Sequence, residues 1–565
     1  MHDLVIRGGH VVDGSGRPAK TADIAVDGDR ITEVGRVGAG KRELDGDGLL
    51  VTPGWVDVHT HYDGQVTWDP YLTPSSWHGV TSVVMGNCGV GFAPVQPDKR
   101  EWLIGLMEGV EDIPGAALSE GIAWDWESFP EYMDAIDRHP HAIDFGVQVP
   151  HGAVRAYVMG ERGANNDEAS AEDVAEMAAI VEQGLRAGAL GFSTSRTLLH
   201  KSIDGIPVPG TFADRNELFG IGEALRNTGT GVFQIAAQHE DVPTELDWID
   251  ELAAWTGRPV SFNLSQIDPD PELWRKGLER LERADSRVVA QVAGRGIGII
   301  LCWEGTGHPF LNRLAYLPLH QLSPEERLIE LRNPEVRKRI IEDQPIDLGD
   351  LGNLVTQSWH KMFVPREDGD LCYEPGPEDS VAAIAQRSGR SPEEVAYDAL
   401  MELDGRGFLY FPLFNYSNNS LDPQFELLSH PRTLLGLSDG GAHCGAICDG
   451  GMATFMLTHW SRDRSRGPRI PLEQIVAMQT RETAMLFGLG DRGLLAPGMK
   501  ADINLIDYEG LRLGHPSMAY DLPAGGRRLI QRAEGYVATI ASGQTILEQG
   551  EPTGSLPGRL LRGSR

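Results

Sequence analysis

Two histidines separated by a single residue are the most informative chemical feature of the sequence. His59 and His61 end the segment Val51–His61, which reads VTPGWVDVHTH. Successive side chains of a β-strand point to opposite faces, so residues two positions apart point the same way. Two imidazoles placed like this can bind one cation, at about 2.0–2.1 Å each for zinc. The pair therefore predicts a metal site at the end of a strand.

A cysteine and an aspartate follow two other predicted strands. Cys88 comes shortly after the apolar segment Val80–Met85, and Asp439 comes shortly after Thr433–Leu437. A lone cysteine is usually a small buried hydrophobe, but at a strand end its thiolate can also bind a metal. An aspartate in a Ser-Asp-Gly-Gly sequence can simply form a turn. It can also accept a proton from an activated water and return it to a leaving nitrogen.

The elements that would position these groups alternate along the middle of the chain. Apolar segments typical of strands are 80–85, 143–149, 231–236, 260–264, 408–414 and 433–437. Amphipathic segments typical of helices are 171–187, 214–227, 246–256, 271–284, 377–403 and 472–486. Strands spaced by helices predict a parallel sheet, and the length suffices for a (β/α)8 barrel. Such barrels carry their chemistry at the carboxyl ends of the strands.

The two ends of the chain differ from the middle. Residues 1–50 and the residues after 500 are short apolar runs broken by glycine and aspartate, which indicates strands joined by tight turns. We therefore expect a composite β-sandwich from residues 1–52 and 494–565, and a catalytic barrel over 53–493. Residues 302–366 interrupt the alternation with glycine, proline and charged helical pieces, and we interpret them as an insertion over the barrel.

Composition and charge narrow the class of protein. The chain has 565 residues, with 82 acidic and 50 basic side chains and a net charge of −32, which disfavours binding to nucleic acid. It has no apolar run long enough for a membrane span and no recognisable secretory signal. Its five cysteines are scattered, which favours a reducing cytoplasm. Large soluble enzymes are commonly homo-oligomers, so we expect one here.

Several motifs together resemble a known family. PGWVDVHTH after a β-rich N-terminus resembles the amidohydrolase superfamily, whose members carry metal on a barrel. The sequences GNCGVGFAP (86–94), HGAVR (151–155), GALGFST (188–194), SDG (438–440) and GLLAPGMKAD (493–502) resemble the N-acyl-D-amino-acid deacylases, or D-aminoacylases. The resemblance implies one or two zinc ions, with Cys88 as a ligand. It also implies that Asp439 contacts the metal and serves as general base and acid, and that the substrate is a small N-acylated D-amino acid.

The sequence departs from this family at two strands. The family places histidines at the ends of strands five and six, but the corresponding segments here read GVFQIAAQH (231–239) and PVSFNLSQ (259–266). We order three outcomes: a metal held by His59, His61 and Asp439 with help from Cys88; a site rebuilt with His239; or loss of the metal.

Three further residues are candidates for substrate binding. His443 lies just beyond Asp439, while His151 and Arg155 follow the third predicted strand. Arginine offers a planar fork for a carboxylate, but structural hydrogen bonds at the barrel rim are an equal alternative for His151 and Arg155. Two rival functions also stand beside deacylation: hydrolysis of a cyclic amide, imide or lactone, and non-catalytic binding on a decayed barrel.

Overall fold

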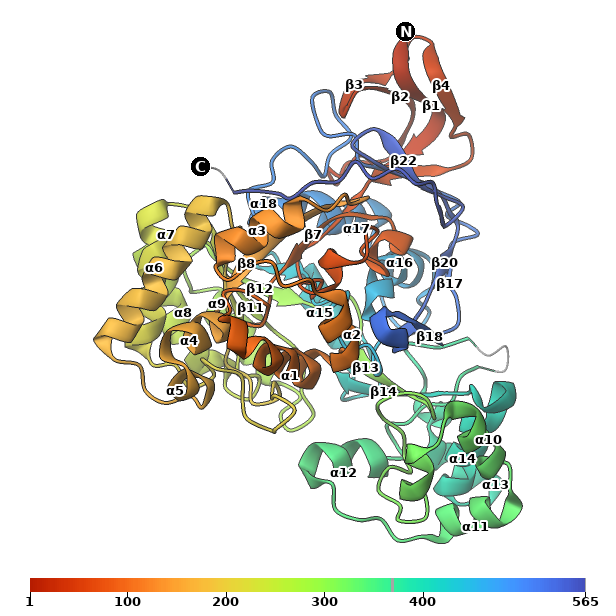
Figure 1. Ribbon diagram of the computed structural model, residues 1–565. Helices are drawn as coiled ribbons and strands as arrows, with labels where there is room; N and C mark the ends of the chain where they lie inside the picture. The colour runs from red at the N-terminus through yellow and green to blue at the C-terminus, as the bar shows by residue number, and fades with distance from the viewer. Residues whose placement is uncertain (367–369, 564–565) are drawn as a thin grey trace.

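A parallel sheet of eight strands forms the centre of the protein (Figure 1). The structure is a computed structural model that describes residues 1–366 and 370–563. The sheet runs in the order β15-β12-β11-β10-β9-β8-β7-β6, and every neighbouring pair is parallel. The strands are β6 (Trp55–Asp57), β7 (Val80–Met85), β8 (Asp144–Pro150), β9 (Gly191–Ser195), β10 (Val232–Ala236), β11 (Val260–Asn263), β12 (Val288–Val292) and β15 (Thr433–Leu435). This sheet confirms the predicted (β/α)8 barrel.

Helices alternate with these strands and cover the outside of the sheet (Figure 1). They include α1 (Arg100–Glu111), α3 (Phe129–Asp137), α6 (Ala171–Ala187), α7 (Arg215–Thr228), α8 (Val242–Thr256), α9 (Leu273–Leu281) and α15 (Asp422–Ser429). Helix α6 shows how the sequence sets its bounds. Ser170 and Asp173 form a capping box at its start, and Gly188 ends it in the left-handed conformation that favours glycine.

One predicted strand is not part of the barrel. The segment Phe408–Phe414 was expected to alternate with helices, and this prediction is wrong. Its strand β14 (Leu409–Phe414) pairs antiparallel with β13 (Ile297–Leu301) in a separate two-stranded sheet. The seventh barrel strand is instead β12, whose sequence VVAQV is almost entirely buried.

The part of the chain that connects β13 to β14 forms a helical subdomain (Figure 1). Its described helices are α10 (Pro324–Leu331), α11 (Pro334–Glu342), α12 (Gly349–Gln357), α13 (Val381–Ser388) and α14 (Pro392–Gly405). Their apolar faces share one hydrophobic cluster that runs from Leu301 to Phe411. The insertion predicted over residues 302–366 falls within this part of the chain, whose described helices α13 and α14 lie beyond residue 366.

The two ends of the chain meet in a second sheet of nine strands, drawn in red and blue in Figure 1. N-terminal strands β1 (His2–Val11), β2 (Lys20–Asp27), β3 (Arg30–Gly35), β4 (Gly40–Asp45) and β5 (Leu50–Pro53) join β16 (Ile503–Ile506), β21 (Tyr536–Ala541), β22 (Gln544–Glu548) and β23 (Glu551–Pro552). The central pairing of β5 with β16 confirms that both termini build one β domain. Residues 564–565 of the predicted segment 494–565 lie outside the described residues.

Membrane-spanning helices were not expected. Among the described residues, no helix is both long and apolar enough to cross a membrane.

A buried charge cluster joins the barrel to the C-terminal part of the chain. Asp144 begins β8, and its carboxylate lies 2.7 Å from both the Arg492 guanidinium and the Lys500 amine. All three side chains are almost completely buried. Burial alone would raise the pKa of Asp144, but the two cations lower it, so the carboxylate stays ionised.

Removing this carboxylate should destabilise the protein more than a surface substitution does. Asp144→Ala leaves two buried cations without their shared anion, and breaking a buried pair costs about 3–5 kcal/mol. We expect the free energy of unfolding in urea to fall by that amount. Asp247→Ala, which breaks an exposed pair with Arg280, is the matched control and should change it by less than about 1 kcal/mol. Equal effects would show that the buried cluster does not hold the two parts together.

Candidate metal centre

The two histidines lie just past the end of β6. Strand β5 passes into β6 through Gly54, where a Cβ atom would lie only 2.2 Å from the Thr81 hydroxyl oxygen, so no larger residue fits. Beyond the strand, Thr60 forms a parallel bridge with Gly440, and the His61 N–H donates to the Gly440 carbonyl at 2.8 Å. His59 and His61 lie on either side of Thr60, and both of their side chains are buried.

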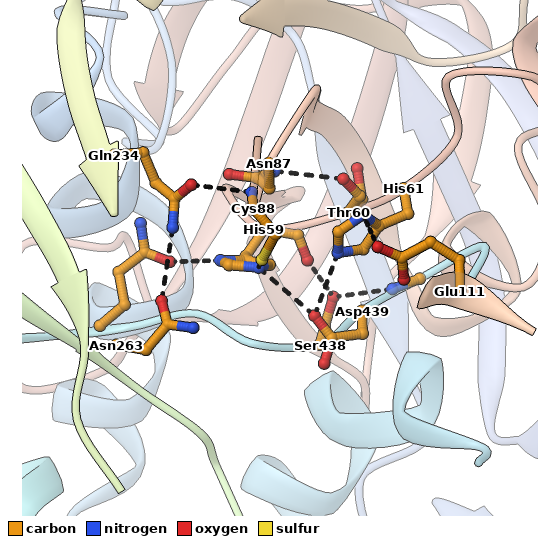
Figure 2. A network of polar contacts seen from close by, with 12 residues as sticks. His59, Thr60, His61, Asn87, Cys88, Glu111, Gln234, Asn263, Ser438 and Asp439 are labelled. Carbon is orange, nitrogen blue, oxygen red and sulfur yellow. Dashed lines mark hydrogen bonds and ion pairs between the residues drawn. The ribbon is translucent and has the colours of Figure 1, made fainter. Parts of the chain in front are cut away.

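Four side chains converge at this point (Figure 2). His59 Nε2 lies 3.3 Å from Cys88 Sγ and 3.5 Å from Asp439 Oδ1, and His61 Nε2 lies 3.5 Å from the same oxygen. Ligands of a tetrahedral zinc ion are separated by about 3.3–3.6 Å when they bind at the usual distances of roughly 2.0–2.3 Å. The donors and their spacing therefore fit a zinc ion.

Burial and mutual contacts set the charges of the cluster. Burial lowers the pKa of His59 to about 4 and raises the pKa of Cys88 to about 11. Burial would also lower the pKa of His61, but Glu111 and Asp439 raise it well above its ordinary value. For Asp439, burial would raise the pKa, but the neighbouring histidines bring it well below its ordinary range. Asp439 is thus an ionised carboxylate at neutral pH.

Polar side chains from several strands hold the Cys88 turn. Gln234 on β10 accepts the Cys88 backbone N–H at 2.9 Å, and Gln234 in turn donates to Asn263 on β11 at 3.4 Å (Figure 2). Asn87 donates to the Thr60 carbonyl at 3.1 Å, which ties this turn to the histidine segment. Strands five and six therefore supply amides that support Cys88 rather than metal-binding imidazoles.

The backbone at Cys88 and Asp439 is unusual. Their φ angles are +56° and +46°, in the left-handed region that few non-glycine residues adopt. Such conformations cluster at functional sites, where the surroundings compensate for their cost. With this backbone conformation, the side chains of Cys88 and Asp439 point towards the two histidines (Figure 2).

Two partners of the histidines were missed by the sequence analysis. Gln291 on β12 lies 2.6 Å from His59 Nδ1, and Glu111 at the end of α1 lies 3.1 Å from His61 Nδ1. Both partners are buried. Neither belongs to a recognisable motif, so no signal in the sequence could have found them.

His151 and Arg155 lie in a closed hydrogen-bond network. His151 lies 2.9 Å from Glu217 and 2.8 Å from Thr194, while Arg155 donates to Glu217 and to backbone carbonyls. All of their charged or polar groups are buried. These contacts favour the structural alternative that the sequence left open for both residues.

Three other histidines lie outside the cluster, on loops that follow barrel strands. His443 Nε2 lies 3.9 Å from Glu111 Oε2, and its side chain is about a quarter exposed. The His239 ring lies 5.1 Å from the Phe414 ring, centre to centre, and its buried Nδ1 has no hydrogen-bond partner among the described residues. The structure does not bring His239 into the cluster of His59, His61 and Cys88. His200, which sequence reasoning missed, has its pKa lowered to about 3 by burial and by the nearby charges of His443, His61 and His239.

Comparison with known proteins identifies the family. The sequence profile described as "Amidohydrolase family" matches residues 42–547. The chain is a member of the amidohydrolase family. A D-aminoacylase and an N-acyl-D-glutamate deacylase, both from Alcaligenes xylosoxydans xylosoxydans, are each 26% identical to it. These alignments cover 99% of this chain and 97% and 96% of the two relatives.

A solved structure has the same fold. It is the N-acyl-D-glutamate deacylase from Bordetella bronchiseptica, complexed with zinc and a phosphonate inhibitor that mimics the tetrahedral intermediate of the reaction. It matches with a TM-score of 0.65 and 22% identity over the full length of both chains. These findings confirm the predicted resemblance to the D-aminoacylase branch and the class of metal-dependent amidohydrolase. They do not favour a cyclic-amide hydrolase or a non-catalytic binding protein.

Metal binding should release a proton from Cys88. With its pKa raised to about 11, the thiol is protonated at neutral pH and must lose that proton to bind zinc as a thiolate. Zinc affinity should therefore rise with pH, and Cys88→Ser should release about one proton fewer per zinc bound. Titration calorimetry in buffers of different ionisation enthalpy measures this number. Cys372→Ser, at a half-buried cysteine outside the cluster, is the control. Equal proton release from all three proteins would rule out a Cys88 thiolate ligand.

Proposed function

We propose that the protein hydrolyses N-acyl-D-amino acids with apolar side chains, using a zinc ion held by His59, His61, Cys88 and Asp439. The observation that carries the proposal is the ionised Asp439 carboxylate placed 3.5 Å from both imidazole Nε2 atoms. The two full-length relatives, which are named for deacylation of D-amino acids, support the substrate class.

Asp439 can perform both proton transfers of amide hydrolysis. When bound, a zinc ion would polarise the substrate carbonyl and make a water molecule more acidic. Asp439 accepts one proton from that water as its oxygen attacks the carbonyl carbon. It then gives this proton to the amide nitrogen as the C–N bond breaks, which yields a carboxylic acid and a free amine. Asp439 is suited to this task because its side chain is 14% exposed, whereas those of His59 and His61 are almost fully enclosed.

An apolar cavity of about 420 Å³ lies at the carboxyl ends of the barrel strands, the side of the barrel that also carries the site. Its walls come from the loops after β9, β10 and β11, from α12 of the helical subdomain and from β14. The lining includes Leu198, Leu199, Leu351, Leu354 and Phe414, together with His239. A cavity with this lining favours an apolar substituent of the substrate.

Half of the polar residues that line the cavity are acidic, and one of these, Asp268, pairs with Lys361. Glu240, Asp268 and Asp350 contribute to its lining, and no lysine or arginine occurs among the described residues that form it. A second carboxylate on the substrate would therefore meet charges of its own sign. This distribution supports apolar over acidic D-amino acids as substrates, with the α-carboxylate held outside the cavity.

We also propose that the enzyme acts in the cytoplasm, where its five free cysteines would stay reduced. We also propose that the enzyme forms a homo-oligomer, because large soluble enzymes commonly do.

Removing the proton acceptor should abolish turnover. Asp439→Asn keeps the shape of the side chain but cannot take up a proton, and general acid–base catalysis contributes about 10²–10⁴-fold. We expect kcat for N-acetyl-D-leucine to fall by that factor, with zinc still bound through His59, His61 and Cys88. Steady-state kinetics and metal analysis of the same preparations measure both effects. If Asp439→Asn retained full kcat, another residue would be the general base.

The cavity should determine which D-amino acids are accepted. We expect kcat/KM for N-acetyl-D-leucine to exceed that for N-acetyl-D-glutamate by roughly tenfold or more, a difference of about 1.4 kcal/mol. Leu351→Arg places a cation in the cavity wall and should shift this ratio towards glutamate. Leu348→Arg is the control, because Leu348 is exposed beside the same helix but does not line the cavity. A wild-type preference for the glutamate or L-leucine derivative would overturn the proposed substrate class.

A further inference from the structure

The two histidines of the site differ in what holds their outer ring nitrogens. Both direct Nε2 towards Asp439, at 3.5 Å in each case. Their Nδ1 atoms face different partners: the amide oxygen of Gln291 for His59, and a carboxylate oxygen of Glu111 for His61. One metal-facing imidazole is therefore backed by a neutral group and the other by an anion.

The contact with Gln291 sets the tautomer of His59. The Gln291 amide nitrogen donates to the Ser261 hydroxyl at 3.1 Å, so its oxygen is the end that faces His59. That oxygen can only accept, and it lies 2.6 Å from Nδ1, so Nδ1 carries the hydrogen. Nε2 is then free of a proton and has a lone pair available for a metal.

The Glu111 carboxylate is buried. Among the described residues, its ion-pair partners are the histidines His61 and His443. Its Oε1 lies 3.1 Å from His61 Nδ1 and its Oε2 lies 3.9 Å from His443 Nε2. The contact with His61 is off the direction of an aligned hydrogen bond, and neither Oε1 nor Nδ1 has another hydrogen-bond partner among the described residues. The Glu111 backbone carbonyl also accepts the N–H of His443. Glu111 thus contacts both His61 and His443, and His443 belongs to the loop that carries Asp439.

We propose that Glu111 is a positioning residue that acts through His61. Its Oε1, 3.1 Å from Nδ1, attracts the Nδ1 side of the ring, keeps Nε2 directed at the zinc site and adds negative charge behind the ligand set. A carboxylate behind a ligating histidine makes that histidine a stronger ligand, and removing such a partner typically costs about 10–100-fold in metal affinity. This role offsets the absence of histidines from strands five and six, while Gln291 orients His59 without adding charge.

The test measures metal affinity rather than turnover. Zinc affinity is obtained by competition with a chromophoric chelator, and cobalt substitution reports ligand geometry through its absorption spectrum. We expect Glu111→Gln to weaken zinc binding about 10–100-fold and to alter the cobalt spectrum. Glu111→Asp, which keeps the charge, should restore part of the affinity. The inference rests on the proposed zinc site but not on the proposed substrate, so a failure of the substrate assignment leaves this readout unaffected.

A matched control exists elsewhere in the chain. Glu217 is also a buried carboxylate that contacts a histidine, with its Oε1 2.9 Å from His151 Nε2, but His151 lies outside the metal cluster. Glu217→Gln should leave zinc affinity and the cobalt spectrum unchanged, whatever its effect on thermal stability. Gln291→Glu should act in the opposite direction to Glu111→Gln and tighten zinc binding.

Two results would overturn the proposal. One is a Glu111→Gln variant that binds zinc within twofold of the wild type. The other is a Glu111→Gln variant that loses affinity together with thermal stability but keeps the wild-type cobalt spectrum, because that combination indicates a purely structural carboxylate.

Discussion

The backbone bridge between Thr60 and Gly440 is the contact on which both the barrel and the site depend. Strands β6 and β15 are the two edges of the parallel sheet and do not pair with each other along their lengths. The sheet closes just beyond them, where the His61 N–H donates to Gly440 at 2.8 Å and the Asp439 N–H donates to His59 at 3.1 Å. The residues that close the barrel therefore carry three of the four proposed metal-binding side chains, so closure of the fold brings His59 and His61 next to Asp439.

Closing the barrel in this way buries several polar groups, and amide side chains from other strands or their turns hydrogen-bond to some of them. Asn87 reaches from the turn after β7, Gln234 from β10 and Gln291 from β12. Each contributes an amide, which can donate and accept at once without adding charge. A buried polar network of this kind is stable only when its members are satisfied, and it then holds a single arrangement. The amides thereby fix the positions of His59 and Cys88 without competing with them for a cation.

The sequence predicted this arrangement where the relevant contacts are local or carried by motifs. His59 and His61 followed from the two-residue period of a strand, and most barrel strands followed from short apolar runs. The seventh strand was misplaced because VVAQV at Val288–Val292 and LYFPLF at Leu409–Phe414 are both short and apolar. Periodicity cannot distinguish a barrel strand from an antiparallel hairpin of that length. Glu111 was beyond prediction for a different reason: its contact with His61 spans fifty positions of sequence and is set by how α1 packs on the barrel.

The charges of the site explain how it can bind metal without the two histidines of strands five and six. In the proposed site, a Cys88 thiolate and the Asp439 carboxylate would together balance one divalent cation, and the deprotonated Nε2 atoms of His59 and His61 would complete four donors. Glu111 then stands behind His61 as a further anion, 3.1 Å from its outer nitrogen. On the loops after β9 and β10, burial lowers the pKa of His200 to about 3 and that of His239 to about 4, so both rings are neutral near pH 7. Neutral imidazoles there can hydrogen-bond a substrate without repelling the cation that the anionic side holds. Negative charge thus gathers around the proposed metal ligands, while the neutral His239 ring lies in the lining of the apolar cavity.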